Sequence, residues 1–244
     1  MEEILSDTIK LDKKGTGVLM IAHRGLSGLE TENTECAFVA AGNRSYYGIE
    51  TDVHFTKDGK YVISHDGNLS RVFGKNIEIK DYLYEDLRKV RKIVNGDTVE
   101  YMAVPTLREY FDVCRRYGKK SVLELKVEYT DEQLKEIIEI AKEEKQFENV
   151  IFISFFPDNM IRLRKILPNH PLQLLTGPIN SEIMDICESN SLEIDADYMS
   201  LNEENIAELK CRGIKINCWI VNDLEYAEKL VSWGVDFITT NILE

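Results

Sequence analysis

The sequence predicts a single (β/α)8 barrel of the TIM type, and three observations favour this fold. Short apolar segments alternate with helical segments along the chain, which is typical of strand–helix units around a parallel sheet. The length of 244 residues suits one such domain over residues 1–244, since these barrels often take about 250 residues. The first apolar segment is followed by His23-Arg24-Gly25. A doubly wound sheet, the rival architecture, usually has a glycine-rich phosphate loop at this point.

Eight strands are expected, each a short apolar run. They lie at 18–22, 48–55, 121–126, 150–154, 171–175, 193–199, 214–221 and 237–240. Seven helices are expected between them, at 34–46, 106–117, 131–145, 158–166, 181–189, 203–211 and 224–233. Thr34 and Thr130 stand at N-cap positions, and Gly118, Gly213 and Gly234 stand where helices should end. An eighth helix is missing from this pattern, and the sequence leaves open whether residues 1–14 pack across the lower end of the barrel instead.

Residues 66–104 interrupt the alternation of strands and helices. Within this segment, residues 81–92 are expected to form a short helix. The segment is rich in lysine and arginine, which we interpret mainly as a solvated helix face. A long loop above the catalytic end of a barrel is nevertheless a suitable place for substrate selection.

Composition limits the partners and the compartment. The formal net charge of −13 argues against nucleic acid or an anionic membrane surface as a partner. No run approaches the roughly 18 apolar residues of a membrane helix, so no stable membrane insertion is expected.

The N-terminal residues do not have the pattern of a signal peptide. Five scattered cysteines without metal-site or redox-motif spacing indicate free thiols. A cytoplasmic protein is therefore expected, and its oligomeric state is not indicated.

Acidic residues lie on the same face of two predicted strands. Glu50 and Asp52 are two residues apart, so both side chains point to one side of the strand. Glu124 and Lys126 have the same spacing at the end of the third strand, and His23 ends the first. Active sites of such barrels lie at the carboxyl ends of the strands. Because neighbouring carboxylates repel one another, a hard divalent cation with oxygen ligands is the simplest occupant. Simple ion pairing of these acids with Arg24 and Lys126 is the structural alternative.

Together these segments resemble the glycerophosphodiester phosphodiesterase family. The resemblance covers about residues 18–240 and rests on the order and spacing of several motifs. They are His23-Arg24-Gly25, Glu32-Asn33-Thr34, Ala37-Phe38, Glu50-Thr51-Asp52-Val53, Thr56-Lys57-Asp58-Gly59, His65-Asp66, Pro105-Thr106-Leu107, Leu123-Glu124-Leu125-Lys126, Cys218-Trp219-Ile220-Val221-Asn222 and Gly234-Val235-Asp236. The resemblance implies that 66–104 form a small subdomain, inserted after the second strand beside the barrel mouth.

The resemblance also implies an activity, namely metal-dependent hydrolysis of glycerophosphodiesters such as glycerophosphocholine or glycerophosphoethanolamine. The products are glycerol 3-phosphate and an alcohol. Glu50, Asp52 and Glu124 match the family's metal ligands. Three carboxylates without cysteine favour one Mg²⁺ or Ca²⁺, and the sequence does not distinguish these two ions. His23 and His65 match the general acid–base pair, with the direction of proton transfer left open.

Four further residues are expected to bind the substrate or its phosphate. Arg24 and Lys126 are placed to offset the phosphoryl charge. Asn33 is expected to hold the first loop and to contact phosphate or metal. Trp219 either forms an apolar wall for the glycerol moiety or packs in the barrel. His54 shares the strand face of Asp52 but stays outside the predicted catalytic set.

Two other functions remain open at this point. A lysophospholipase D-like or other phosphodiesterase on the same barrel is one, although no obvious apolar segment supplies a channel for an acyl chain. A non-catalytic barrel that binds metal or phosphate is the other, and the presence of both histidines, all three acids and Lys126 argues against it. The eighth strand ends Thr239-Thr240-Asn241-Ile242, whereas family members often have Thr-Asp-x-Pro. We interpret this departure as affecting barrel closure and not the chemistry.

Overall fold

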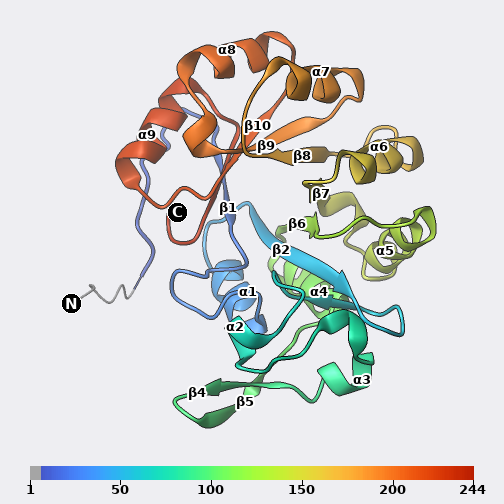
Figure 1. The fold of residues 1–244 in the computed structure, drawn as a ribbon. Coiled ribbons are helices and arrows are strands. Elements are labelled where there is room, and N and C mark those ends of the chain that lie inside the picture. The colour runs from blue at the N-terminus through green and yellow to red at the C-terminus, as the bar shows by residue number, and fades with distance from the viewer. Residues whose placement is uncertain (1–6) are drawn as a thin grey trace.

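The predicted (β/α)8 barrel is confirmed. The computed structural model describes residues 7–244, apart from the side chains of residues 94, 100 and 101. Eight parallel strands follow the order β1-β11-β10-β9-β8-β7-β6-β2, and pairing of β1 with β2 closes the barrel (Figure 1). These strands are β1 (Leu19–Ala22), β2 (Gly48–Phe55), β6 (Lys120–Leu125), β7 (Val150–Ser154), β8 (Leu172–Thr176), β9 (Glu193–Asp197), β10 (Ile216–Trp219) and β11 (Phe237–Thr240).

Seven helices alternate with these strands, at the predicted places. They are α1 (Glu35–Gly42), α4 (Leu107–Tyr117), α5 (Asp131–Glu143), α6 (Pro157–Ile166), α7 (Ser181–Ser189), α8 (Glu203–Cys211) and α9 (Leu224–Trp233). The side chains of Thr34, Thr106 and Thr130 cap the first free N–H groups of α1, α4 and α5. Strand β9 is shorter than predicted because residues 198–200 turn into a 3₁₀ helix. None of the helices in residues 7–244 is both long enough and apolar enough to cross a membrane.

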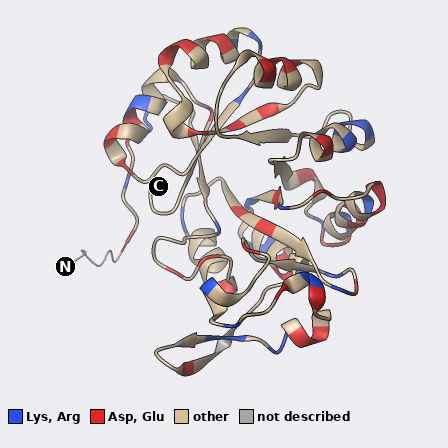
Figure 2. Cartoon of the chain, viewed as in Figure 1, with Lys and Arg blue, Asp and Glu red and all other residues tan. Residues whose placement is uncertain are grey.

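Charged residues are distributed unevenly between the outside and the barrel wall. Figure 2 shows Asp and Glu over the outer helices, among them α5, α7 and α8, where they are mixed with Lys and Arg. Acidic residues also occur on β2 (Figure 2), a strand whose first six residues are buried. The acidic residues that give the net charge of −13 therefore lie both on solvated helix faces and on a buried strand of the barrel wall.

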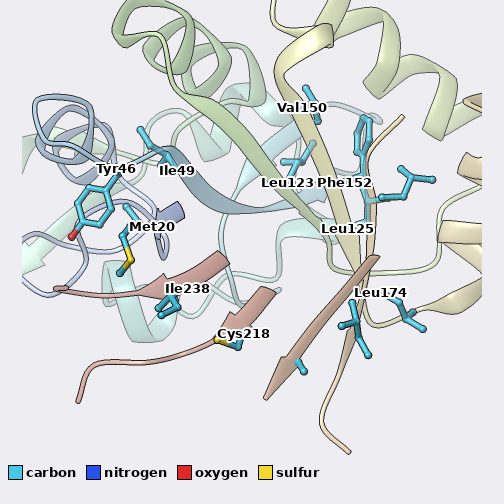
Figure 3. Close-up of a cluster of buried hydrophobic side chains, with 14 of the residues drawn as sticks. Met20, Tyr46, Ile49, Leu123, Leu125, Val150, Phe152, Leu174, Cys218 and Ile238 are labelled. Atoms are coloured by element: carbon cyan, nitrogen blue, oxygen red, sulfur yellow. The ribbon is translucent and has the colours of Figure 1, made fainter. Parts of the chain in front are cut away.

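The core has two layers because successive strand side chains point to opposite sides of the barrel wall. Outward-facing residues pack under the helices, including Met20, Ile49 and Phe152 (Figure 3). A smaller inner cluster fills the barrel interior and consists of Ile21, Val122, Ile151, Ile153, Leu175 and Phe237. The side chains of Gln173, Asn217 and Thr239 are also buried there and hydrogen-bond to one another.

The segment between β2 and α4 contains six short elements, namely β3 (Tyr61–Ile63), α2 (Ser70–Phe73), a 3₁₀ helix (Ile79–Asp81), α3 (Tyr84–Leu87), β4 (Arg91–Val94) and β5 (Asp97–Ala103). It has a hydrophobic cluster of its own, formed by Val62, Leu69, Phe73, Ile79, Leu87, Val90 and Val104. The predicted helix over residues 81–92 is wrong, since α3 is one turn long and residues 91 and 92 belong to β4. Asn95 and Gly96 both have positive φ and join β4 to β5, and Asn-Gly is the preferred sequence of such a hairpin turn.

Residues near the two chain ends pair with each other. The backbone N–H of Ile9 donates to Ile242, and that of Leu11 donates to Glu244 (3.1 and 2.8 Å). Leu11 and Leu243 are buried in the main core. The Glu244 carboxylate accepts hydrogen bonds from the Ser45 backbone and the Thr8 hydroxyl, both at 2.6 Å. As predicted, no helix follows β11 within residues 7–244. Residues 9–11 instead pack with the C-terminal residues against the outer side of the barrel.

Candidate active site

A pocket of about 420 Å³ opens at the carboxyl ends of the barrel strands, and its lining divides into two kinds. Most of the charged and titratable side chains come from residues 23–126, namely His23, Arg24, Glu50, His65, Glu124 and Lys126. The remaining wall is mostly apolar and is formed by Ile153, Phe155, Leu175, Trp219 and Ile220, with Asp195 and Thr239.

Three carboxylates converge beside this pocket. Asp52 and Glu124 are register partners on β2 and β6, and Glu50 lies two residues before Asp52. One oxygen of each residue lies within 4.8 Å of the others, and all three residues are buried. Oδ1 of Asp52 is buried and accepts no hydrogen bond in the described part of the chain, although it lies 3.4 Å from the Lys126 ammonium. Buried, clustered carboxylates are the donor set that a hard divalent cation prefers.

The three carboxyl groups have different pKa values. Burial and the charge of Asp52 raise the pKa of Glu50 well above its usual range and that of Glu124 to about 8. Burial acts on Asp52 in the same direction, but the cations of Lys126 and Arg24 outweigh it and hold the pKa of Asp52 below its usual value. Without a bound cation, the cluster therefore concentrates its negative charge on Asp52.

Arg24 and Lys126 are the cations that contact these acids. The Lys126 ammonium lies 2.9 Å from Glu124 and 3.4 Å from Asp52. The Arg24 backbone donates to Glu50 at 2.8 Å, and its guanidinium lies 3.5 Å from Asp52. Arg24 has φ of 53°, an uncommon value for a residue with a side chain. This backbone turn allows the main chain and the side chain of Arg24 to contact different carboxylates.

Both histidines have Nδ1 held by a neighbouring oxygen. Nδ1 of His23 lies 2.7 Å from Oδ1 of Asn241, and Nδ1 of His65 lies 2.8 Å from Asp66. An amide oxygen only accepts hydrogen bonds, so Nδ1 of His23 carries the hydrogen, and Nε2 lies 4.0 Å from Glu50. Burial, together with the charge of Arg24, lowers the pKa of His23 to about 4. Each ring therefore keeps Nε2 available for proton transfer.

The other predicted residues are placed differently. Asn33 is buried beneath Asp52, to which its amide donates at 2.7 Å, and it accepts from the Thr51 hydroxyl at 2.7 Å. It is not among the residues that line the pocket. Trp219 does line the pocket, and its indole donates to the backbone oxygen of Asp195 at 3.1 Å. His54 contacts the backbone oxygen of His65 at 3.2 Å and supports the chain at that point.

A series of ion pairs that the sequence analysis missed connects Arg24 with His65. Arg71, from the inserted helix α2, forms two hydrogen bonds to Glu32 (2.7 and 2.8 Å) and one to Asp66 (2.6 Å). Glu32 also pairs with Arg24 at 2.9 Å, and Asp66 contacts His65. Glu32 and Asp66 belong to motifs visible in the sequence. Arg71 is one of many basic residues in the insertion, so no sequence signal singled it out.

Asp195 and Asn241 were also missed as site residues. Asp195 is an isolated acid within a predicted strand, and this unusual position is the sequence signal that could have identified it. Asn241 belongs to the segment that departs from the family pattern. Our interpretation that this departure concerns only barrel closure was wrong, because the Asn241 side chain contacts His23.

Comparison with known proteins gives consistent matches over nearly the whole chain. The model of the glycerophosphoryl diester phosphodiesterase family matches residues 23–244. A putative glycerophosphodiester phosphodiesterase, YhdW of Bacillus subtilis, is 31% identical over 91% of this chain and 93% of its own length. The glycerophosphodiester phosphodiesterase of Caldanaerobacter subterraneus has the same identity and the same two coverages.

Solved structures agree with the fold. A phosphodiesterase of Oleispira antarctica, in complex with the product sn-glycerol-3-phosphate, has a TM-score of 0.83 at 24% identity and covers 91% of this chain and 92% of that one. A glycerophosphodiester phosphodiesterase of Thermotoga maritima has a TM-score of 0.71 at 28% identity and covers 92% and 94%.

Proposed function

We infer the function from one fact, that the chain belongs to the glycerophosphoryl diester phosphodiesterase family and is therefore a phosphoric diester hydrolase. We propose that its substrates are small glycerophosphodiesters such as glycerophosphocholine or glycerophosphoethanolamine. The products are glycerol 3-phosphate and the free alcohol. The observation that carries this proposal is the pocket that joins three buried carboxylates, two cations and two histidines.

The carboxylates of Glu50, Asp52 and Glu124 would hold one Mg²⁺ or Ca²⁺. The fit is supported by their oxygen donors, their burial and the lack of a hydrogen bond to Oδ1 of Asp52 in the described part of the chain. When bound, this cation supplies positive charge to the phosphoryl oxygens. Asn33 keeps the Asp52 carboxylate in place through the hydrogen bond to its Oδ2, so its contribution to substrate binding is indirect.

The remaining residues act directly on the substrate. Arg24 and Lys126 contact the phosphoryl oxygens and offset their charge, which lets an otherwise acidic protein accept an anion. His23 and His65 exchange protons with the attacking oxygen and the leaving alkoxide through their Nε2 atoms. Trp219 provides an apolar surface for the glycerol carbons. The cytoplasmic location remains a prediction, supported by five free cysteines.

A substrate panel with controlled metal content tests this proposal. Glycerophosphocholine, glycerophosphoethanolamine and a lysophosphatidylcholine are assayed with Mg²⁺, with Ca²⁺ and with excess chelator. We expect turnover of the two small diesters, its loss on chelation and its recovery when either ion is returned. Glu50→Ala and Asp52→Ala should lose both metal binding, measured by calorimetry, and turnover.

The same panel separates the alternatives. Preferential cleavage of the lysolipid would support a lysophospholipase D-like enzyme. Binding of metal without turnover of any diester would support a non-catalytic barrel. Full activity in excess chelator, with no metal retained in the protein, would exclude the metal-dependent mechanism.

A further inference from the structure

Asp195 is a buried acid that the proposed chemistry does not use. It lies on β9 with 1% of its surface exposed, and it lines the pocket. Its Oδ1 is buried and has no hydrogen-bond partner among residues 7–244. A buried polar atom without a partner is destabilising, because it has lost its hydrogen bonds to water. A ligand group that hydrogen-bonds to this carboxyl would remove that penalty.

The position of Asp195 separates it from the catalytic groups. In the closed strand order, β9 lies four strands away from β2 in either direction, so Asp195 is on the opposite side of the barrel from Glu50 and Asp52. Its register neighbour on β8 is Leu175, and the indole of Trp219 on β10 donates to its backbone. The carboxyl group thus lies beside the apolar side chains of Leu175 and Trp219. Its register neighbour on β10 is Asn217, whose side chain already hydrogen-bonds to Gln173 and Thr239.

We propose that Asp195 binds a hydroxyl group of the polyol part of the substrate and makes the enzyme selective for polyol phosphodiesters. This inference rests on the proposed function and adds the residue that recognises the glycerol side. The phosphate is held at the acidic cluster, and the apolar wall contacts the carbon atoms of the polyol. The carboxyl then hydrogen-bonds to the hydroxyl.

The state of the carboxyl favours a hydroxyl over a cationic head group. Burial raises the pKa of Asp195 well above its usual range, which favours the protonated form of the carboxyl. A neutral carboxyl offers one donor and additional acceptor sites, which match a hydroxyl. An ammonium ion in the same apolar surroundings would need an anion.

A matched pair of substrates tests this role. Glycerophosphocholine and propylphosphocholine share the phosphodiester and the choline group, and only the first has hydroxyls on its three-carbon chain. The ratio of their kcat/KM values is measured for the wild type, Asp195→Leu and Asp195→Asn. Asp197→Asn is the control, since Asp197 lies on the same strand but does not line the pocket.

The wild type should prefer glycerophosphocholine strongly, since sites built around a substrate hydroxyl reject analogues without it by up to about 10⁴-fold. Asp195→Leu should bring the ratio close to one, mainly by loss of activity on glycerophosphocholine. Asp195→Asn, which keeps hydrogen-bonding atoms, should fall between, and Asp197→Asn should keep the wild-type ratio. An unchanged ratio in Asp195→Leu, or an equal loss on both choline diesters, would overturn the inference.

A binding measurement distinguishes this failure from failure of the proposed function. Calorimetry with the Mg²⁺-loaded protein compares glycerol 3-phosphate with propyl phosphate. We expect tighter binding of glycerol 3-phosphate to the wild type and similar affinities for Asp195→Leu. A wild type that hydrolyses neither diester contradicts the proposed function. A wild type that hydrolyses glycerophosphocholine but binds both phosphates equally contradicts the role of Asp195 alone.

Discussion

His23 and His65 come from different parts of the first half of the chain but are held in the same way. In each ring Nδ1 contacts a side-chain oxygen, from Asn241 or from Asp66. This arrangement fixes the orientation of the ring and reserves Nε2 for the substrate.

We therefore predict that His23→Ala and His65→Ala each lower kcat by about 10²–10⁴-fold, the usual contribution of general acid–base catalysis. Metal binding and the circular dichroism spectrum should not change. His54→Gln is the control, because glutamine can retain the contact with the backbone oxygen of His65. Near wild-type turnover in either alanine variant would assign that histidine a structural role.

The second prediction concerns Lys126. Its ammonium lies within 3.4 Å of both Asp52 and Glu124 and at the pocket wall. Removal of one charged contact to the transition state costs a few kcal/mol, so Lys126→Met should lower kcat/KM by roughly 10²-fold or more. Inhibition by glycerol 3-phosphate should weaken as well. Lys89→Met, at an exposed lysine paired with Asp86, should change neither constant. Equal behaviour of the two variants would move the phosphate contact elsewhere.

The sequence predicted the residues whose position depends only on strand periodicity. Glu50, Asp52, Glu124 and Lys126 lie together in one cluster at the pocket because residues two apart on a strand face the same side. Partners brought together by long-range folding were not predicted. Asn241 reaches His23 across 218 positions of the chain, and no local pattern marks such a contact.

Among the elements, the short helix α2 connects the insertion to the site. Its Arg71 binds Glu32 and Asp66 at once, and these acids contact Arg24 and His65. The insertion was visible in the sequence as a break in the strand–helix alternation. Its hairpin was missed because lysine- and arginine-rich residues before Asn95-Gly96 also suit a helix.

We predict that Arg71→Met lowers kcat by about ten- to hundredfold, because small displacements of catalytic groups have effects of this size. Arg108→Met is a matched control, since Arg108 is similarly exposed and pairs with two glutamates, Glu143 and Glu144. The test of positioning is a double-mutant cycle. In a His65→Ala background, Arg71→Met should have a much smaller effect. Additive effects would show that Arg71 acts independently of His65.

For the whole molecule, Glu244 holds three separate segments together. Its side chain is 4% exposed and contacts Lys10, Thr8 and Ser45. Burial alone would raise the pKa of Glu244, but the hydrogen bonds from Lys10, Thr8 and Ser45 outweigh it and lower the pKa to about 2. Because the folded-state pKa lies below the ordinary value of 4.5, this carboxylate stabilises the fold above about pH 4.5. The contribution is lost as the pH falls towards 2.

Glu244→Gln should accordingly lower the free energy of unfolding by about 1–3 kcal/mol at pH 7. Denaturant unfolding of both proteins between pH 7 and pH 2 measures the difference. We expect that difference to shrink as the pH falls below about 4.5. Glu225→Gln, at an exposed position of α9, should have little effect. A difference independent of pH would show that the charge of Glu244 does not contribute.

The two-sided lining of the pocket has a consequence for how such enzymes diverge. The groups proposed for the reaction come from residues 23–126, and the apolar wall with Asp195 comes from residues 153–220. Mutations that change substrate preference can therefore accumulate in the second stretch while the reactive groups stay intact. Asn241 lies after both stretches, and its side chain contacts His23 in the first. Chimeras joined near residue 149 should inherit their reaction from one parent and their selectivity for the polyol from the other, provided that the pairing of Asn241 with His23 is kept.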